Sequence, residues 1–257
     1  MGAPFPYGAV VVSGAGGGLG SAVARRLASH GAPLLLLDRT PPDELAAALA
    51  DTDSACLALG AELRDETSLL RALELGAQEL GPARHLVHCA AVLRMAPLRT
   101  LGAEEFRDVL DVNVVGALLL ARAVAISASG DGSLVLVSST GGIVSGADSV
   151  AYGASKHALH GVMQGLAEAF APMDVRVNAV APGTMDTPLF GREVARDWQE
   201  RFSGLTAEEK LAANSSESLF GRLLDVEDIA ELCCFLLTRA TRSVTGQIYP
   251  AWGAPLS

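Results

Sequence analysis

The stretch that decides the fold reads SGAGGGLG, from Ser13 to Gly20. A short apolar run with three consecutive valines precedes it at 8–13, and a segment with leucine or valine at every fourth position follows at 18–30. Glycines between a strand and a helix let the backbone approach a pyrophosphate, and the helix N-terminus offers unpaired amides and a positive dipole end. The stretch therefore predicts a turn that binds a nucleotide, rather than an ordinary flexible turn.

The glycines of this turn follow the spacing G-x-x-x-G-x-G, through Gly14, Gly18 and Gly20. The spacing differs from G-x-G-x-x-G, because Leu19 stands where the third glycine of that motif would fall.

A carboxylate follows the second apolar run of the chain, at 33–37. Asp38 stands where a side chain can accept hydrogen bonds from both ribose hydroxyls of an adenosine, and its charge would repel a 2′-phosphate. This favours NAD over NADP. The neighbouring Arg39 keeps NADP open, because an arginine in this region can pair with that phosphate.

The alternation of apolar runs and helical segments continues along the chain. Further strands are expected at 54–59, 85–89, 132–138, 175–181 and 247–249, and helices at 44–50, 66–80, 103–126, 152–170 and 226–237. Strands that are apolar throughout, alternating with amphipathic helices, are typical of a parallel sheet covered on both faces. We expect one α/β domain over residues 1–257, a doubly wound Rossmann-type sheet with helices on both faces.

The composition excludes several classes of protein. Half of the 257 residues are hydrophobic and 19% are charged, which excludes a disordered chain or a small disulfide scaffold. A net charge of −10 speaks against nucleic-acid binding. No apolar stretch of about 18 residues occurs, so we expect no membrane span.

The N-terminus lacks a basic signal region, and the four cysteines show no CxxC pair or zinc-type spacing. We expect reduced thiols, no metal site and a cytoplasmic protein.

A tyrosine and a lysine stand four residues apart, in YGASK from Tyr152 to Lys156. On a helix this spacing places both on one face, and a nearby ammonium is expected to lower the pKa of the phenol toward the range of an acid/base catalyst. Alone, the pair is common on helix surfaces. Three further features support a catalytic role: Ser139 ends the preceding strand, Asn113 needs a partner within an apolar helical run, and Thr187 follows a strand that closes in Pro-Gly.

With these motifs the chain resembles the short-chain dehydrogenase/reductase family over nearly its whole length. The resemblance implies a catalytic tetrad. Tyr152 would exchange a proton with the substrate oxygen, Ser139 would polarise that oxygen, Lys156 would hold the nicotinamide ribose, and Asn113 would anchor a chain of waters. Hydride would pass directly between the cofactor and a carbinol carbon, so no metal is required.

The resemblance also implies the cofactor contacts. Thr187 would bind the nicotinamide carboxamide, Ala90 would lie beneath the adenosine, and Glu62 replaces the usual aspartate near the adenine, with Leu63 supplying a backbone N–H. The full expected set is Ser13, Gly14, Gly16, Gly18, Leu19, Gly20, Asp38, Arg39, Glu62, Leu63, Ala90, Tyr152, Lys156, Pro182, Gly183 and Thr187.

Besides Glu62, the chain departs from the family pattern at three places. Ser13 replaces a threonine, which keeps the hydroxyl. His88-Cys89-Ala90-Ala91 stands where Asn-Asn-Ala-Gly is usual, and the usual Val-Asp-Gly-Gly near the C-terminus is replaced by a segment that contains Trp252. We expect the last change to affect subunit contacts or the substrate mouth.

Two short motifs bear on the substrate. VLRM, from Val92 to Met95, and the segment 182–187 are similar to those of 2,3-dihydro-2,3-dihydroxybenzoate dehydrogenases, which oxidise a cyclic dihydrodiol acid with NAD. Arg94 is then a candidate for pairing with a carboxylate, beside Ser139 and Tyr152, and it is equally a surface cation. Two other classes stay open: an NADPH-dependent ketoreductase of polyketide or acyl thioesters, and a non-catalytic cofactor-sensing protein.

Two larger features are also predicted. The more polar stretch 189–219 is expected to be a substrate lid. The segments 103–126 and 152–170 carry apolar residues on more than one face, including Leu159, Val162, Met163 and Leu166, which suggests a homo-oligomer. The family resemblance makes this a homotetramer.

Overall fold

In the part of the chain that the structure describes, seven parallel strands form one sheet in the order β3-β2-β1-β4-β5-β6-β7. The structure is a computed structural model and describes residues 8–128, 130–185, 187–189 and 222–252. The strands are β1 (Ala9–Ser13), β2 (Leu34–Asp38), β3 (Cys56–Gly60), β4 (Ala83–His88), β5 (Gly132–Val137), β6 (Val175–Pro182) and β7 (Ile248–Ala251). The strand order reverses beside β1, which confirms the expected doubly wound sheet and opens a crevice at the carboxyl ends of the strands.

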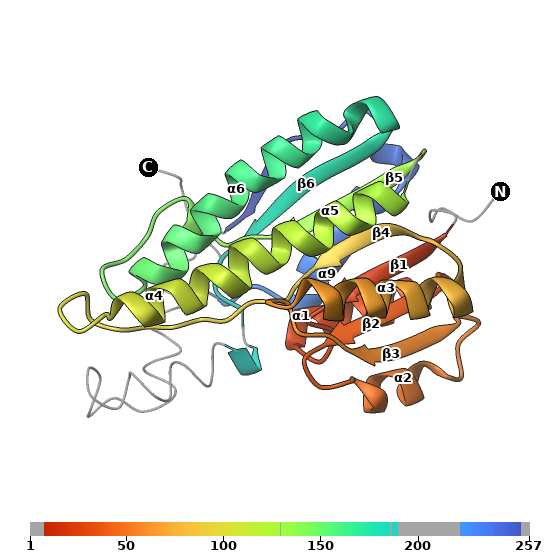
Figure 1. Ribbon diagram of the computed structural model, residues 1–257, viewed down its shortest axis with the longest axis horizontal. Helices are drawn as coiled ribbons and strands as arrows, with labels where there is room; N and C mark the ends of the chain where they lie inside the picture. The colour runs from red at the N-terminus through yellow and green to blue at the C-terminus, as the bar shows by residue number, and fades with distance from the viewer. Residues whose placement is uncertain (1–7, 129, 186, 190–221, 253–257) are drawn as a thin grey trace.

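Helices cover both faces of this sheet (Figure 1). One face carries α1 (Gly18–Ala28), α2 (Asp43–Leu49) and α9 (Val226–Leu237). The other carries α3 (Glu66–Leu80), α4 (Ala103–Leu110), α5 (Ala117–Ser127) and α6 (Val150–Phe170). Both faces of the sheet are therefore shielded from water, as a parallel sheet requires.

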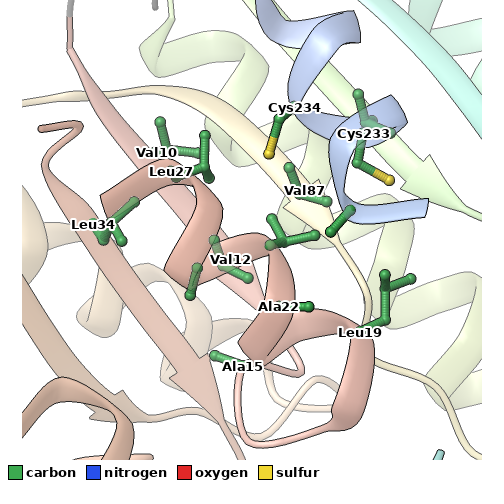
Figure 2. Close-up of a cluster of buried hydrophobic side chains, with 14 of the residues drawn as sticks. Val10, Val12, Ala15, Leu19, Ala22, Leu27, Leu34, Val87, Cys233 and Cys234 are labelled. Carbon is green, nitrogen blue, oxygen red and sulfur yellow. The ribbon is translucent and has the colours of Figure 1, made fainter. Parts of the chain in front are cut away.

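Alternate residues of each strand enter opposite cores, because side chains in a strand point to opposite faces. Val10 and Val12 of β1 join the core beneath α1 and α9, whereas Val11 joins the core beneath α3, α5 and α6. Figure 2 shows the first of these cores, where Cys234 of α9 points toward Leu27 of α1 and Val10 of β1, and Cys233 belongs to the same core. All four cysteines are free thiols, as expected.

The expected single helix at 103–126 contains an irregular turn. A π-helical segment, η1 (Asp111–Gly116), joins α4 to α5. By length and mean hydropathy, 2.0, the continuous stretch Ala103–Ser127 could cross a membrane. However, Ala117, Leu120 and Val124 are fully buried against the sheet, and on the outer face Arg122 pairs with Glu66. Packing of this helix against the sheet therefore explains why the segment is apolar.

The four residues that suggested an oligomer are covered within the chain. Leu159, Met163 and Leu166 are buried beneath α6, and Val162 packs against the same core. These four side chains therefore pack toward the sheet of their own chain, and the expected oligomer needs other support.

Candidate active site

A cleft of about 1280 Å³ lies at the carboxyl ends of the strands. Its walls come from the turn after β1, the end of β2, and the segments that follow β3, β4, β5 and β6. Every expected cofactor contact lines this cleft, and so do Ser139 and Arg94. The fold thus brings residues as far apart in the sequence as Ser13 and Thr187 into one cleft, as in other open α/β sheets.

The glycine turn forms one end of the cleft by close approach of backbone to backbone. Gly14 has φ of 69°, and a Cβ there would lie 2.6 Å from the amide nitrogen of Ala90. A Cβ on Gly20 would lie 2.1 Å from the carbonyl oxygen of Gly14. Gly17 caps α1 without any side-chain hydrogen bond, so the first amides of the helix are left for another acceptor.

Asp38 closes this end of the cleft. Its carboxylate accepts hydrogen bonds from the amide of Gly16 at 3.0 Å and from the amide of Arg39 at 2.7 Å. The carboxylate is therefore fixed beside the glycine turn, while the Arg39 side chain is exposed at the rim.

Glu62 and Leu63 form the neighbouring wall. Glu62 accepts hydrogen bonds from the amide of Arg64 at 3.2 Å and from its guanidinium at 3.3 Å. Burial alone would raise the pKa of Glu62, but these hydrogen bonds lower the pKa overall. Leu63 packs on η1, where a Cβ at Gly116 would lie 2.7 Å from the Cβ of Leu63.

Ser139, Tyr152 and Lys156 meet at the other end of the cleft. The Ser139 hydroxyl faces the Tyr152 phenol and favours its ionised form, which lowers the pKa of the tyrosine. Ser139 also accepts from the amide of Gly141 at 3.0 Å, which leaves its own proton for the tyrosine. Lys156 is buried, donates from Nζ to the carbonyl of Val137 at 2.8 Å, and lies 5.7 Å from the centre of the Tyr152 ring.

The expected lowering of the Tyr152 pKa by Lys156 is wrong for this structure. Burial raises the pKa of Tyr152 to about 12, and the hydrogen bond from Ser139 offsets only part of this rise. Burial also lowers the pKa of Lys156 to about 8. The desolvation of both groups outweighs their attraction, so at neutral pH the tyrosine is a protonated phenol.

Asn113 lies behind the cleft wall in η1. Its Oδ1 accepts from the amide of Val92 at 2.8 Å, and its Nδ2 donates to the carbonyl of Val92 at 2.9 Å and to Ser155 Oγ at 3.0 Å. The amide thus has the partners that its burial required. The sequence did not identify Ser155, although its place three residues after Tyr152 on the same helix was a signal.

The atypical His88-Cys89 pair contacts the strand β1 through the side chain of His88. His88 Nδ1 lies 2.8 Å from Ser13 Oγ, which ties the ends of β4 and β1 together beneath the glycine turn. Burial, with a smaller contribution from Lys156, lowers the pKa of His88 to about 3. Burial raises the pKa of the Cys89 thiol to about 12. Both side chains are therefore neutral at physiological pH.

Arg94 lies on the segment after β4, on the cleft wall. Val92 fixes this segment to Asn113, and the amide of Ala96 donates to the carbonyl of Asp148 at 2.9 Å, just before α6. Because α6 carries Tyr152, these two attachments hold Arg94 at the catalytic end of the cleft.

The segment after β6 crosses the mouth of the cleft. A Cβ at Gly18 would lie 3.1 Å from the methyl group of Thr187, so this threonine contacts the first turn of α1. Trp252 packs on Gly183, where a Cβ would lie 2.9 Å from the indole. The expected lid at 189–219 lies outside the described residues, except for Leu189, which lines the cleft. Within the described part of the chain, no three His, Cys, Asp or Glu side chains are grouped so as to hold a metal.

Comparison with known proteins agrees with this geometry. A family model described as "Enoyl-(Acyl carrier protein) reductase" matches residues 14–251. The cis-4-hydroxycyclohexanecarboxylate dehydrogenase of Sinomonas cyclohexanicum is 34% identical over 252 residues, and the alignment covers 96% of each chain.

Two solved structures have a similar fold. A short-chain type dehydrogenase/reductase from Mycobacterium ulcerans has a TM-score of 0.86 at 27% identity, covering 98% of this chain and 90% of that one. An actinorhodin polyketide ketoreductase variant, solved with NADPH, has a TM-score of 0.87 at 24% identity, covering 96% of each. At that identity the ketoreductase indicates the fold alone.

Proposed function

Because the chain belongs to the short-chain dehydrogenase/reductase family and is an oxidoreductase, we propose that it transfers a hydride between NAD and a cyclic secondary alcohol or its ketone. We base the catalytic role on one observation. Ser139, Tyr152 and Lys156 line the same end of a cleft that begins at a glycine turn, with Lys156 Nζ 5.7 Å from the centre of the Tyr152 ring.

The residues present fit a nicotinamide dinucleotide. A pyrophosphate suits the uncapped amides of α1 and the glycine backbone at the turn, where Gly14 and Gly20 have no room for a side chain. Asp38 would accept hydrogen bonds from the adenosine ribose, Lys156 would hold the nicotinamide ribose, and Thr187 would bind the carboxamide. When bound, the nicotinamide accepts a hydride from the carbinol carbon or delivers one to the ketone carbon.

The protein side chains would handle the proton. In the reducing direction the protonated Tyr152 donates its proton to the substrate oxygen. In the oxidising direction Tyr152 must first lose this proton, and its phenolate then takes the proton of the substrate hydroxyl. Ser139 donates a hydrogen bond to the same substrate oxygen. Lys156 stabilises the phenolate that forms. Asn113 acts by fixing the Val92 segment and Ser155 against α6, where the family resemblance also expects it to anchor a chain of waters.

The position of Asp38 supports NAD. Its carboxylate is fixed next to Gly16, where it would repel a 2′-phosphate, while the exposed Arg39 can turn into solvent. Reduction of polyketide or acyl thioesters with NADPH is the outcome that would replace this proposal. Binding of the cofactor with no turnover of any alcohol or ketone would indicate a cofactor-sensing protein instead.

The cleft wall supports a substrate that carries a carboxylate. The relative from Sinomonas cyclohexanicum acts, by its name, on a six-membered ring with a hydroxyl and a carboxylate. Here Val92 and Leu93 offer an apolar surface beside Tyr152, and Arg94 offers a cation farther along the same segment. We propose that the ring packs on the apolar surface and that Arg94 pairs with the carboxylate.

Initial rates followed at the nicotinamide absorbance test this substrate. We expect oxidation of cis-4-hydroxycyclohexanecarboxylate with NAD, and a higher KM for cyclohexanol, which lacks the carboxylate. Arg94→Ala should raise the KM for the acid by about tenfold and leave that for cyclohexanol unchanged. Arg99→Ala removes a cation from the same connection outside the cleft lining and is the matched control. Equal effects of both variants would remove Arg94 from the substrate site.

We further propose a cytoplasmic homotetramer that binds small molecules and neither nucleic acid nor membrane. Support comes from the family and from the exposed apolar residues Val115 and Ile126 on the outer side of η1 and α5. Light scattering should give four times the chain mass of 26.4 kDa. A monomeric mass at micromolar concentration would contradict the tetramer.

A further inference from the structure

One stripe of α6 faces the end of β5 and the two residues after it. Tyr152, Lys156 and His160 are spaced by four residues, so they lie on one face of the helix. The segment 137–139 contacts all three. Its first residue binds Lys156 through a carbonyl, its second contacts Lys156 and His160, and its third faces Tyr152. His160 therefore continues the catalytic stripe, and its spacing from Lys156 was visible in the sequence.

Ser138 connects His160 to the backbone of Lys156. Both Ser138 and His160 are buried, with 3% and 8% of their surface exposed. The hydroxyl of Ser138 donates to the carbonyl of Lys156 at 3.1 Å and lies 2.7 Å from His160 Nε2. Ser138 lines the cleft and His160 does not, so His160 reaches the catalytic residues through Ser138.

Counting protons gives this chain of hydrogen bonds a direction. A serine hydroxyl has one hydrogen, and here it goes to the carbonyl of Lys156. The contact with His160 then requires the histidine to donate from Nε2. Burial first, and then repulsion from His157 and Lys156, lowers the pKa of His160, so the ring is neutral. The contact with Ser138 selects the tautomer with the proton on Nε2. His160 donates to Ser138, and Ser138 donates to Lys156.

The backbone around Lys156 is held from a second side. A Cβ on Gly142, in the turn Thr140–Gly142, would lie 2.7 Å from the carbonyl carbon of Lys156. His157 Nδ1 lies 2.8 Å from the carbonyl of the same glycine. Because this turn packs directly on α6, there is no free space between them. Loss of the Ser138 hydrogen bond should therefore shift α6 relative to Ser139.

We propose that His160 is a positioning residue for the reaction. By donating to Ser138, it directs the serine proton onto the backbone of Lys156 and so sets the position of Lys156 and Tyr152 against Ser139. The inference rests on the proposed function, because it assumes that these three side chains meet the reacting atoms.

Ser133 of β5 and Ser138, which directly follows β5, allow a matched test of this role. Ser133→Ala and Ser138→Ala each remove a buried hydroxyl that donates to a helix carbonyl, at 3.0 Å to Leu236 of α9 and at 3.1 Å to Lys156 of α6. Both variants should lose similar stability. Only Ser138→Ala should lower kcat, by about tenfold, with the KM for NAD unchanged. Equal kcat values for the two variants would reduce Ser138 to a structural contact.

His160 is tested by loss and by rescue. His160→Leu keeps the volume and removes the donor, and we expect kcat to fall by about tenfold. His160→Gln places an amide donor near the Nε2 position and should return kcat to within about twofold of wild type. The double variant Ser138→Ala, His160→Leu should be no slower than either single variant, because the two residues act in series.

The outcomes separate the two proposals. If Tyr152→Phe retains wild-type turnover, the proposed function fails. If Tyr152→Phe is inactive while folded His160→Leu matches wild type, the function stands and the role of His160 is refuted. If His160→Gln is as slow as His160→Leu, hydrogen-bond donation is not what His160 supplies, and the inference is likewise refuted.

Discussion

The two ends of the cleft are built from different materials. At the cofactor end the contacts come from the backbone, where glycines bring the turn after β1 against Ala90 and against itself. At the catalytic end they come from side chains of η1, α6 and the end of β5, held by hydrogen bonds between elements far apart in the sequence. At the cofactor end, the side chain of Asp38 contacts the glycine turn by accepting a hydrogen bond from the amide of Gly16.

This difference teaches what each end can tolerate. A backbone site fails when an atom is added, because a Cβ has nowhere to go. A side-chain site fails when an atom is removed, because chemistry or a buried hydrogen bond is lost. Substitutions at the two ends should therefore separate into effects on cofactor binding and stability, and effects on turnover.

The largest effect should come from the catalytic end. Tyr152→Phe removes the proton donor and keeps the ring, so kcat should fall by about 10²–10⁴-fold. Thermal unfolding and NAD binding, measured by calorimetry and titration, should stay close to wild type. Turnover near that of wild type would show that Tyr152 is not the acid/base group.

The cofactor end should respond in binding. Asp38→Ala removes a charged acceptor worth about 1.5–3 kcal/mol, which is roughly 10- to 150-fold in the KM for NAD. Discrimination against NADP should relax at the same time. Asp43→Ala removes the same charge from an exposed position that also lines the cleft, and should change the preference little. An unchanged NAD/NADP ratio in Asp38→Ala would exclude the carboxylate as the discriminator.

Crowding of the glycine turn should appear in stability. Gly20→Ala forces the helix away from the Gly14 carbonyl and should lower the free energy of unfolding by about 1–3 kcal/mol, with a raised KM for NAD. Gly31→Ala has a positive φ and no neighbour within 4 Å, so its cost of about 1 kcal/mol is conformational alone and should spare cofactor binding. Denaturant titration measures both. A Gly20→Ala variant with wild-type stability and KM would contradict the close packing of the turn.

The smallest effect should be a dependence on pH. Burial lowers the pKa of Lys156 to about 8, so the lysine is charged below this pH and neutral above it. Loss of the charge removes its stabilisation of the phenolate, and kcat/KM for ketone reduction should fall above pH 8, by at most about tenfold per pH unit. Tyr152, with a pKa of about 12, stays protonated and does not cause this fall. In Lys156→Met the fall should vanish from a slower enzyme, and its persistence there would assign it to another group.

The sequence by itself determined the sheet and the composition of the cleft. Continuous apolar strands exclude an exposed face, and a glycine turn between strand and helix has few other uses, so local pattern was enough. The spacing of Tyr152 and Lys156 placed both on one helix face, and the apolar surroundings of Asn113 required a partner for its amide.

Only the tertiary structure decided the pKa values of the catalytic residues and the hydrogen-bond partners of the residues behind them. Whether Lys156 lowers the pKa of Tyr152 depends on how deeply both are buried, and burial reversed the expected direction for the tyrosine. The apolar residues of α6 that suggested an oligomer pack on the sheet, whereas Val115 and Ile126 of η1 and α5 stay exposed. Likewise, the bonds of Ser138 to Lys156 and His160 depend on where β5 and α6 meet. Desolvation and long-range contact are properties of the packed chain, and residue order alone does not fix them.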